Sequence, residues 1–184
     1  HWLPALPGVI DKLRAGGRVV DVGCGAGVVP VAIARAFPAA TVAGIDLDSH
    51  SIDLARAAAR AAGVDVQLEA LGVEALPTEP GWDLVTTFDV VHDQASPRNV
   101  LRGIRISLAD DGVYLAQDIK ASSDVQHNRE HPIGSLLYTI SCMHCMTVSL
   151  AQGGDGLGAM WGKEMAVRYL QDAGFHSVEV HELA

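Results

Sequence analysis

The stretch Asp21-Val22-Gly23-Cys24-Gly25-Ala26-Gly27 constrains the fold of this chain more than any other feature of its sequence. It overlaps the end of a β-branched run at residues 18–22 and precedes an apolar, Ala-rich run at residues 28–37, which Pro38 closes. Glycines at alternate positions allow a sharp turn and let a ligand approach the backbone. The sequence therefore predicts a strand, a tight glycine turn and a helix in succession.

Strand and helix patterns go on alternating as far as residue 119. Further strands are expected at residues 41–46, 64–69, 82–88 and 113–119, the last entered through a turn at Asp110-Asp111-Gly112. Between them, one helix is capped by Asp48 or Ser49 and stopped by Gly63, and another begins at Pro97 after Ser96. This alternation predicts an α/β fold, a Rossmann-like, doubly wound and mostly parallel sheet with helices on both faces.

The regular pattern breaks over residues 120–162, which we interpret as an inserted cap over the substrate pocket. A helix at about residues 136–150 is apolar nearly all round, so it is expected to be buried on several sides. A dimer interface is the alternative role for this helix. A regular helix returns at residues 163–173, and a last strand is expected at residues 177–183.

Length and composition set outer limits on function. The 184 residues fit one domain, residues 1–184. A net charge of −9 argues against non-specific nucleic-acid binding. Three cysteines without a secretory signal favour a reducing cytoplasm. The longest apolar run, residues 133–150, falls short of the ~20 residues that span a bilayer, so no membrane partner is expected.

The acidic residues around the glycine turn distinguish two ligand classes. Asp46 ends the second strand, 19 residues beyond Gly27, where an acid can accept hydrogen bonds from ribose hydroxyls. Asp21 would repel the pyrophosphate of a dinucleotide but attract the ammonium group of a methionine moiety. The pattern therefore favours S-adenosylmethionine (SAM), with product S-adenosylhomocysteine (SAH). An NAD-dependent oxidoreductase is the alternative, opposed by Asp21 and by the lack of a G-x-G-x-x-G spacing.

Over about residues 8–119 the chain resembles the class I SAM-dependent methyltransferases. The matching segments are Asp21–Gly27, Gly44-Ile45-Asp46-Leu47-Asp48, Trp82-Asp83-Leu84-Val85 and Asp110-Asp111-Gly112. His92-Asp93-Gln94-Ala95-Ser96-Pro97 and the segment from Cys142 to Gly154 are similar to a bacterial subgroup that carries an N-terminal winged-helix-like domain. By this resemblance we expect that domain to be missing from this sequence and the sheet to lack its last hairpin strand.

The resemblance also implies roles for individual residues. Five residues would surround the methionine part of SAM: Asp21, Gly23, Cys24, Gly25 and Gly27. Asp46 would hold the ribose, Leu47 would pack on the adenine, and Phe88 and Asp89 would complete the methionine site. Where relatives often carry an Asp for the adenine amino group, this chain has Gly72. Backbone groups of Leu71, Gly72 and Val73 would replace that Asp, or Glu74 would reach across.

His92 and Asp93 follow the fourth strand, at the carboxyl edge of the sheet, and are the candidate catalytic residues. A general base there could deprotonate a substrate hydroxyl or amine. The alternative is that Asp93 or Ser96 only caps the next helix. Cys142, His144 and Cys145 are interpreted as packing residues of a buried helix. No metal is expected, because nothing in the sequence joins them to other ligands such as His127 and His131.

Taken together, the sequence predicts methyl transfer from SAM to an unidentified, small-molecule acceptor. A non-catalytic SAM-binding regulatory domain is the alternative from another class. A homodimer is compatible with the sequence, and an N-terminal domain missing from this sequence would form its interface. The atom type of the acceptor cannot be read, because this scaffold suits oxygen, nitrogen and carbon acceptors.

Overall fold

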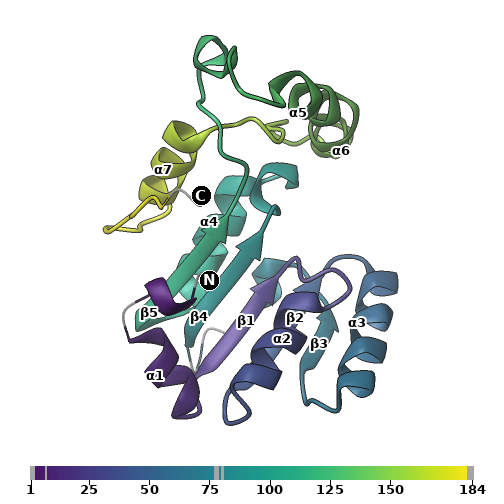
Figure 1. Cartoon of the computed structure of the whole chain (residues 1–184), viewed down its shortest axis with the longest axis vertical. Helices are drawn as coiled ribbons and strands as arrows, with labels where there is room; N and C mark the ends of the chain where they lie inside the picture. The colour runs from purple at the N-terminus through teal and green to yellow at the C-terminus, as the bar shows by residue number, and fades with distance from the viewer. Residues whose placement is uncertain (1–2, 7, 77–78, 80, 182–184) are drawn as a thin grey trace. The chain divides into compact units, whose positions relative to one another are not determined.

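The computed structural model describes residues 3–6, 8–76, 79 and 81–181 (Figure 1). The chain forms two compact units. Unit 1 comprises residues 1–88 and 106–116, and unit 2 comprises residues 89–105 and 117–184.

Unit 1 is built on a five-stranded sheet with the order β3-β2-β1-β4-β5. Its strands are β1 (Arg18–Val22), β2 (Thr41–Asp46), β3 (Gln67–Ala70), β4 (Trp82–Phe88) and β5 (Leu108–Gln117). The pairs β1–β2, β1–β4 and β2–β3 are parallel. The expected α/β, Rossmann-like, doubly wound and mostly parallel sheet is therefore confirmed.

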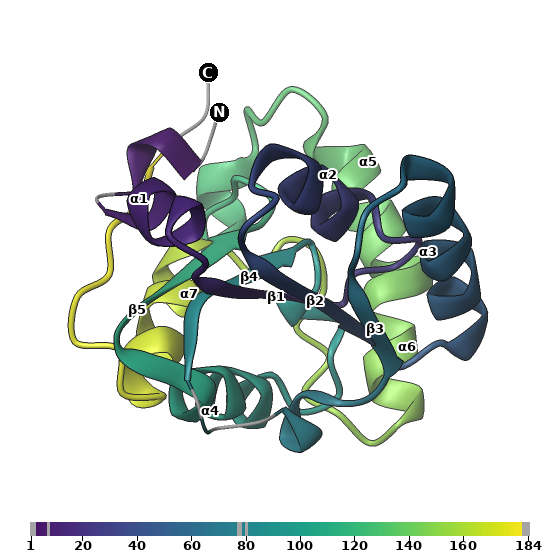
Figure 2. The ribbon, with the colours of Figure 1, turned by 90° about the horizontal axis from the view of Figure 1, so that it is seen from below.

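Strand register explains how the core of unit 1 is built. Val19 pairs with Val42 on one side and with Leu84 on the other, so the three side chains point to the same face. On that face they pack with helix α1 (Val9–Arg14) and helix α2 (Val28–Ala36). Helix α3 (Ser49–Ala62) packs beside α2, and Figure 2 shows these helices flanking the strands.

The ends of α3 follow the chemistry that the sequence predicts. The Asp48 carboxylate accepts hydrogen bonds from the backbone N–H groups of His50 and Ser51, which satisfies two free donors of the first turn. Gly63 ends the helix in the left-handed conformation, with a φ of 66°. Asp48 therefore marks the start of α3 after β2, and Gly63 marks its end before β3.

Two predicted strands differ in their bounds. The third strand was expected at residues 64–69 and lies at Gln67–Ala70. The fifth was expected to begin after a turn at Asp110-Asp111-Gly112, but β5 starts at Leu108, directly after helix α4 (Pro97–Ser107), and runs through those residues. The predicted turn at residues 110–112 is therefore wrong, because the chain stays extended there. The strand β5 ends at Gln117, where the sequence predicted Ile119.

Unit 2 holds the segments that follow β4 and β5. A short 3-10 turn, η3 (Val91–Asp93), follows β4, and another, η4 (Val125–Asn128), follows β5. One helical stretch then combines α5 (Gly134–Ile140), a π-helical turn (Ser141–Cys145) and α6 (Met146–Ala151), and α7 (Lys163–Asp172) comes last.

Unit 1 also contains two 3-10 turns. The turn η1 (Leu3–Ala5) precedes α1, and η2 (Val73–Ala75) follows β3.

The prediction that the apolar helix is buried on several sides is wrong. Its buried residues include Ser141, Cys145 and Ser149, whereas Leu136 and Met143 are 56% and 76% exposed. The two serines are buried because their hydroxyls make hydrogen bonds inside unit 2: Ser141 Oγ accepts from the Ala159 N–H, and Ser149 Oγ donates to the Gln94 carbonyl. The inner side of the helix is thus small and polar.

The length and apolar composition of Gly134–Ala151 are enough for a membrane span, a test that core helices of soluble proteins also pass. Length alone therefore does not exclude a span, contrary to the expectation from the sequence. The last strand, expected at residues 177–183, is not formed over residues 177–181, and residues 182–183 lie outside the described residues. In the described part of the chain, β5 is an edge strand of the sheet, and β3 is the other.

Candidate functional site

The glycine turn lies at the carboxyl end of β1 and is tied to the neighbouring strand. The N–H groups of Gly23 and Cys24 both donate to the Ile45 carbonyl, at 2.8 and 2.9 Å. Gly27 has a φ of 81°, and a Cβ at this position would come within 2.7 Å of the Ala55 Cβ in α3. Both the backbone conformation and the close helix contact therefore require glycine at position 27.

Asp46 joins the end of β2 to the glycine turn. Its Oδ2 accepts a hydrogen bond from the Gly25 N–H, and its Oδ1 accepts one from the Asp48 N–H, each at 2.9 Å. A carboxylate oxygen can accept more than one hydrogen bond, so acceptor capacity remains for ligand hydroxyls. The sequence pattern that paired Asp46 with the glycine turn thus corresponds to a direct contact.

Asp21 is a buried acid beside this turn. It is 3% exposed and accepts a 2.5 Å hydrogen bond from the Thr86 hydroxyl on β4, which the strand register places opposite it. Burial, and then the nearby Asp46 charge, outweighs that hydrogen bond and raises the pKa of Asp21 to about 7. Burial, with Asp21 and Asp46, likewise raises the pKa of Cys24 to about 12, so Cys24 stays a neutral thiol. Thr86 was not anticipated from the sequence.

The loop after β3 continues the same edge of the sheet. The Leu71 N–H donates to the Asp46 carbonyl at 3.0 Å, and Val73 is buried. A Cβ at Gly72 would overlap both carboxylate oxygens of Glu74, so the Glu74 side chain folds back over Gly72. Leu47, by contrast, is 69% exposed at the end of β2.

The fourth strand ends at a strained residue. Asp89, the residue after Phe88, has a φ of 54°, the only positive φ outside glycine among the described residues. Asp tolerates this conformation better than most residues, and such strain is concentrated at functional sites. The Asp89 N–H donates to the Gln117 carbonyl at 3.0 Å, and burial with the Asp118 charge raises the pKa of Asp89.

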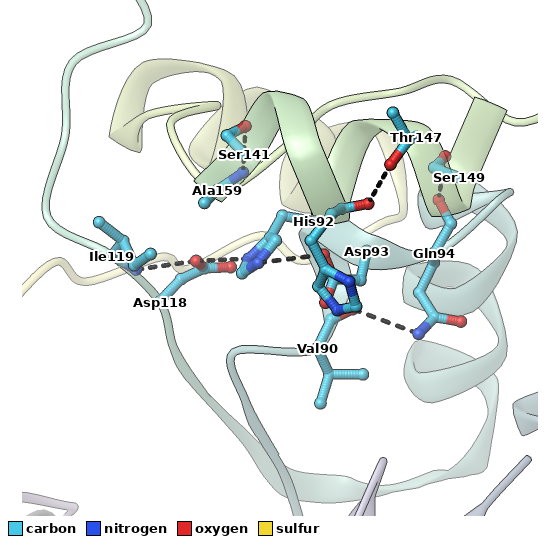
Figure 3. Close-up of polar contacts among 11 residues, drawn as sticks. Val90, His92, Asp93, Gln94, Asp118, Ile119, Ser141, Thr147, Ser149 and Ala159 are labelled. Atoms are coloured by element: carbon cyan, nitrogen blue, oxygen red, sulfur yellow. Dashed lines mark hydrogen bonds and ion pairs between the residues drawn. The ribbon is translucent and has the colours of Figure 1, made fainter. Parts of the chain in front are cut away.

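In unit 2, the His92 imidazole lies between two carboxylates (Figure 3). Its Nδ1 is 2.8 Å from Asp118 Oδ1, and its Nε2 is 3.3 Å from Asp93 Oδ1. The side chain is 4% exposed. Burial lowers the pKa of His92, but the Asp118 hydrogen bond and the charges of Asp118, Asp93 and Asp89 outweigh it, so the pKa is raised.

Cys145 faces the same pair of residues. Its sulfur, a nitrogen of His92 and a carboxylate oxygen of Asp93 all lie within 4.8 Å of one another. Asp89, His92 and Asp118 form a second group of this kind in unit 2. Cys142 is exposed while Cys145 is buried, so the two cysteines do not act as a pair. The predicted packing role fails for Cys142 and His144, which are both exposed, and holds for the buried Cys145.

The candidate residues fall into two groups. Those predicted to hold the cofactor, Asp89 excepted, lie in unit 1 at the carboxyl ends of β1, β2, β3 and β4. The candidate catalytic residues, His92 and Asp93, lie in unit 2 with Asp89, Asp118 and Cys145. Asp118 was missed from the sequence, although its place after the fifth strand was a usable signal, because the carboxyl ends of parallel strands share one edge.

Comparison with known proteins now identifies the family. The profile of the family described as "Methyltransferase domain" matches residues 13–174, most of the chain. The chain belongs to this family. The resemblance to class I SAM-dependent methyltransferases is thereby confirmed.

Curated relatives of this methyltransferase domain carry a more specific name. A ubiquinone biosynthesis O-methyltransferase of Bordetella avium is 38% identical over 104 residues, which cover 55% of this chain and 41% of the relative. One from Burkholderia pseudomallei is 28% identical over 171 residues, covering 92% of this chain and 68% of the relative. The chain spans less than half the length of the Bordetella relative.

Solved structures agree on the fold. A methyltransferase candidate from Bacillus halodurans matches with a TM-score of 0.71 at 22% identity, covering 94% of this chain and 68% of that one. PigF, solved with SAH, matches with a TM-score of 0.68 at 21% identity, covering 97% of this chain and 52% of PigF. At these identities the likeness concerns the fold.

Proposed function

We propose that this methyltransferase domain transfers the methyl group of SAM to a hydroxyl oxygen of a small-molecule acceptor. The observation that carries the cofactor assignment is the pair of acids flanking one glycine turn: Asp21, buried at the end of β1, and Asp46, hydrogen-bonded to Gly25. Asp21 suits the ammonium of the methionine moiety and Asp46 suits ribose hydroxyls. A pyrophosphate ligand would meet a carboxylate instead of free N–H donors.

The sheet order supports an arrangement of SAM along the edge formed by the carboxyl ends of the strands. The methionine lies over β1, next to Gly23, Cys24, Gly25 and Gly27, with Phe88 and Asp89 at the end of β4 completing its site. The ribose follows at β2, and the adenine at the end of β3, with Leu71, Gly72 and Val73. Neighbouring strands are ~4.8 Å apart. A ligand that reaches from β1 across β2 to β3 therefore crosses three strands. Leu47, exposed beside Asp46, offers an apolar surface for the adenine.

On the acceptor side we assign His92 and Asp93. Relatives of this domain are named as O-methyltransferases of ubiquinone biosynthesis, which favours a hydroxyl acceptor. Methyl transfer needs the acceptor oxygen to lose its proton, and His92 Nε2 is the ring nitrogen that Asp118 does not occupy. Asp118 fixes the tautomer that leaves this nitrogen free to take the proton, and Asp93 stabilises the imidazolium that forms.

Calorimetry of the purified protein with SAM, SAH and NAD tests the cofactor assignment. SAM and SAH are expected to bind and NAD is not. Tight NAD binding without SAM binding would return the chain to the oxidoreductase alternative. Methylation of phenolic acceptors, followed by SAH release, then tests the reaction; SAH binding with no turnover on any acceptor class would favour the non-catalytic regulator.

The proposal also includes a cytoplasmic setting, without nucleic-acid or membrane partners, and allows a homodimer. The charge of −9 supports the first exclusion. Sedimentation of the purified protein measures the oligomeric state directly.

A further inference from the structure

Three side chains of unit 2 form a ligand set that methyl transfer does not use in full. His92 and Asp93 come from the turn after β4, and Cys145 comes from the helical stretch, 52 residues after Asp93. One ligand atom from each lies within 4.8 Å of the other two. Imidazole nitrogen, thiolate sulfur and carboxylate oxygen are the donors that zinc accepts in proteins.

The surroundings of His92 are those of a metal-binding histidine. Its Nδ1 is 2.8 Å from Asp118 Oδ1, and that same oxygen accepts a 2.8 Å hydrogen bond from the Ile119 N–H (Figure 3). Histidines that bind metals nearly always pair the second ring nitrogen with such an acceptor, which orients the ring. Here that pairing directs Nε2 toward Asp93.

Asp93 supplies an independent observation. Its Oδ1 is shielded from solvent and has no well-aligned hydrogen-bond partner; it lies 3.3 Å from His92 Nε2, and the Cys145 thiol is also close to the carboxylate. A buried carboxylate oxygen without a well-aligned donor costs free energy, and a cation at this point would lower that cost. The Asp93 carboxylate is close to both His92 and Cys145.

We propose that His92, Asp93 and Cys145 bind a zinc ion, and that zinc at this site inhibits methyl transfer. Ligand atoms around tetrahedral zinc are about 3.3–3.8 Å apart, so the cluster would have to contract by up to roughly 1 Å. Three protein ligands leave the fourth position for water. A thiolate ligand disfavours Mg²⁺ and Ca²⁺, which take oxygen ligands.

Coordination forms a zinc–sulfur bond and releases the Cys145 thiol proton to solvent, with no change of oxidation state. The inhibition rests on the proposed function, because zinc would occupy the Nε2 lone pair that otherwise takes the acceptor proton. Zinc binding itself does not depend on that function, since all three ligands lie in unit 2 and none is assigned to SAM.

The metal alone is the probe. Metal-free protein is titrated with Co²⁺, then with Zn²⁺ against a chromogenic chelator. One equivalent is expected to bind, with a thiolate-to-cobalt charge-transfer band. Cys145→Ser should abolish the band and weaken binding at least tenfold, and Asp118→Asn should weaken it by about 10–100-fold. Cys142→Ser is the matched control, three residues away and exposed, and should change nothing.

Absence of the charge-transfer band in the unaltered protein would overturn the site. This test needs no substituted protein, so it does not depend on whether a variant folds. Equal losses in Cys142→Ser and Cys145→Ser would overturn it as well. Stoichiometric zinc binding that leaves turnover intact would overturn the inhibitory role. Calorimetry with SAH in the absence of metal tests the proposed function separately, so the two failures are distinguishable.

Discussion

The Asp46 carboxylate accepts a 2.9 Å hydrogen bond from the backbone N–H of Gly25, joining the end of β2 to the glycine turn after β1. A single side chain therefore shapes the turn and presents its remaining acceptor capacity at the surface where a ribose would lie. Substitution of Asp46 is expected to affect ligand binding through both effects.

Asp46→Ala should lower the affinity for SAH by about tenfold or more, because a hydrogen bond to a charged group contributes ~1.5–3 kcal/mol. Asp46→Asn keeps an acceptor oxygen, so its affinity for SAH should lie between those of Asp46→Ala and the parent. Calorimetry measures both, with Asp65→Ala as the control at an exposed acid away from the turn. Unchanged affinity in Asp46→Ala would place the ribose elsewhere.

SAH affinity should depend on pH through Asp21, whose pKa is raised to about 7 in the unliganded protein. Below pH 7 the carboxyl must lose its proton before it can pair with the ammonium group, so affinity should fall by up to about tenfold per pH unit between pH 7 and 6. Above pH 8 this dependence should vanish. A titration that is flat from pH 6 to 8 would contradict the assignment.

Asp21→Asn should weaken SAH binding but raise the melting temperature of the unliganded protein at pH 8. The folded pKa lies above the unfolded value of 3.8, so the parent gains stability as pH falls from about 7 to 4 and is least stable with Asp21 charged. Asparagine removes that buried charge. Scanning calorimetry at pH 8 and pH 5 checks this: the advantage of the variant should shrink at pH 5.

His92→Asn should leave SAH affinity intact and lower turnover by about 10²–10⁴-fold, because it removes the proton acceptor and leaves the cofactor site untouched. Single-turnover kinetics with saturating SAM is the measurement. Asp118→Asn should reduce turnover less, since it disturbs only the ring orientation. If SAH affinity falls with turnover, His92 shapes the cofactor site instead.

Glu74→Gln should weaken SAH binding by about tenfold, because the carboxylate folded over Gly72 can accept from the adenine amino group, a donor. S-inosylhomocysteine has an oxygen in place of that amino group and should bind the parent weakly, with no further loss in the variant. Glu69→Gln on β3 is the matched control. If Glu74→Gln preferred SAH over S-inosylhomocysteine as strongly as the parent does, Glu74 would be excluded from adenine recognition.

Local signals predicted unit 1 well, and the reason is visible in β1 and α3. The run Val19-Val20 is buried on both faces, so it reads as a continuous apolar strand, and Asp48 and Gly63 mark α3 by backbone chemistry that needs no distant partner. Asp21–Gly27 and Asp46 were found because the turn and its acid lie at adjacent strand ends.

Unit 2 was predicted less well, because its order depends on partners far apart in the sequence. Ser141 is buried with a hydrogen bond from Ala159, and Ser149 is buried with hydrogen bonds to Gln94 and from Gly156. No local sequence pattern indicates those partners. Composition alone therefore suggested the opposite orientation for Leu136 and Met143. Asp118 and Cys145 joined the candidate site for the same reason: their importance comes from proximity to His92.

The contact between Gly27 and Ala55 has a consequence for how this site recognises its ligand. Gly27, the residue that caps the start of α2, cannot carry even a methyl group without displacing α3, and the N–H groups of Gly23 and Cys24 donate to the Ile45 carbonyl. The turn is thus as rigid as the interior beneath it, so its amide hydrogens should exchange slowly before any ligand arrives. Little conformational entropy then remains to be lost on association. We therefore expect the turn to keep this conformation when a ligand binds.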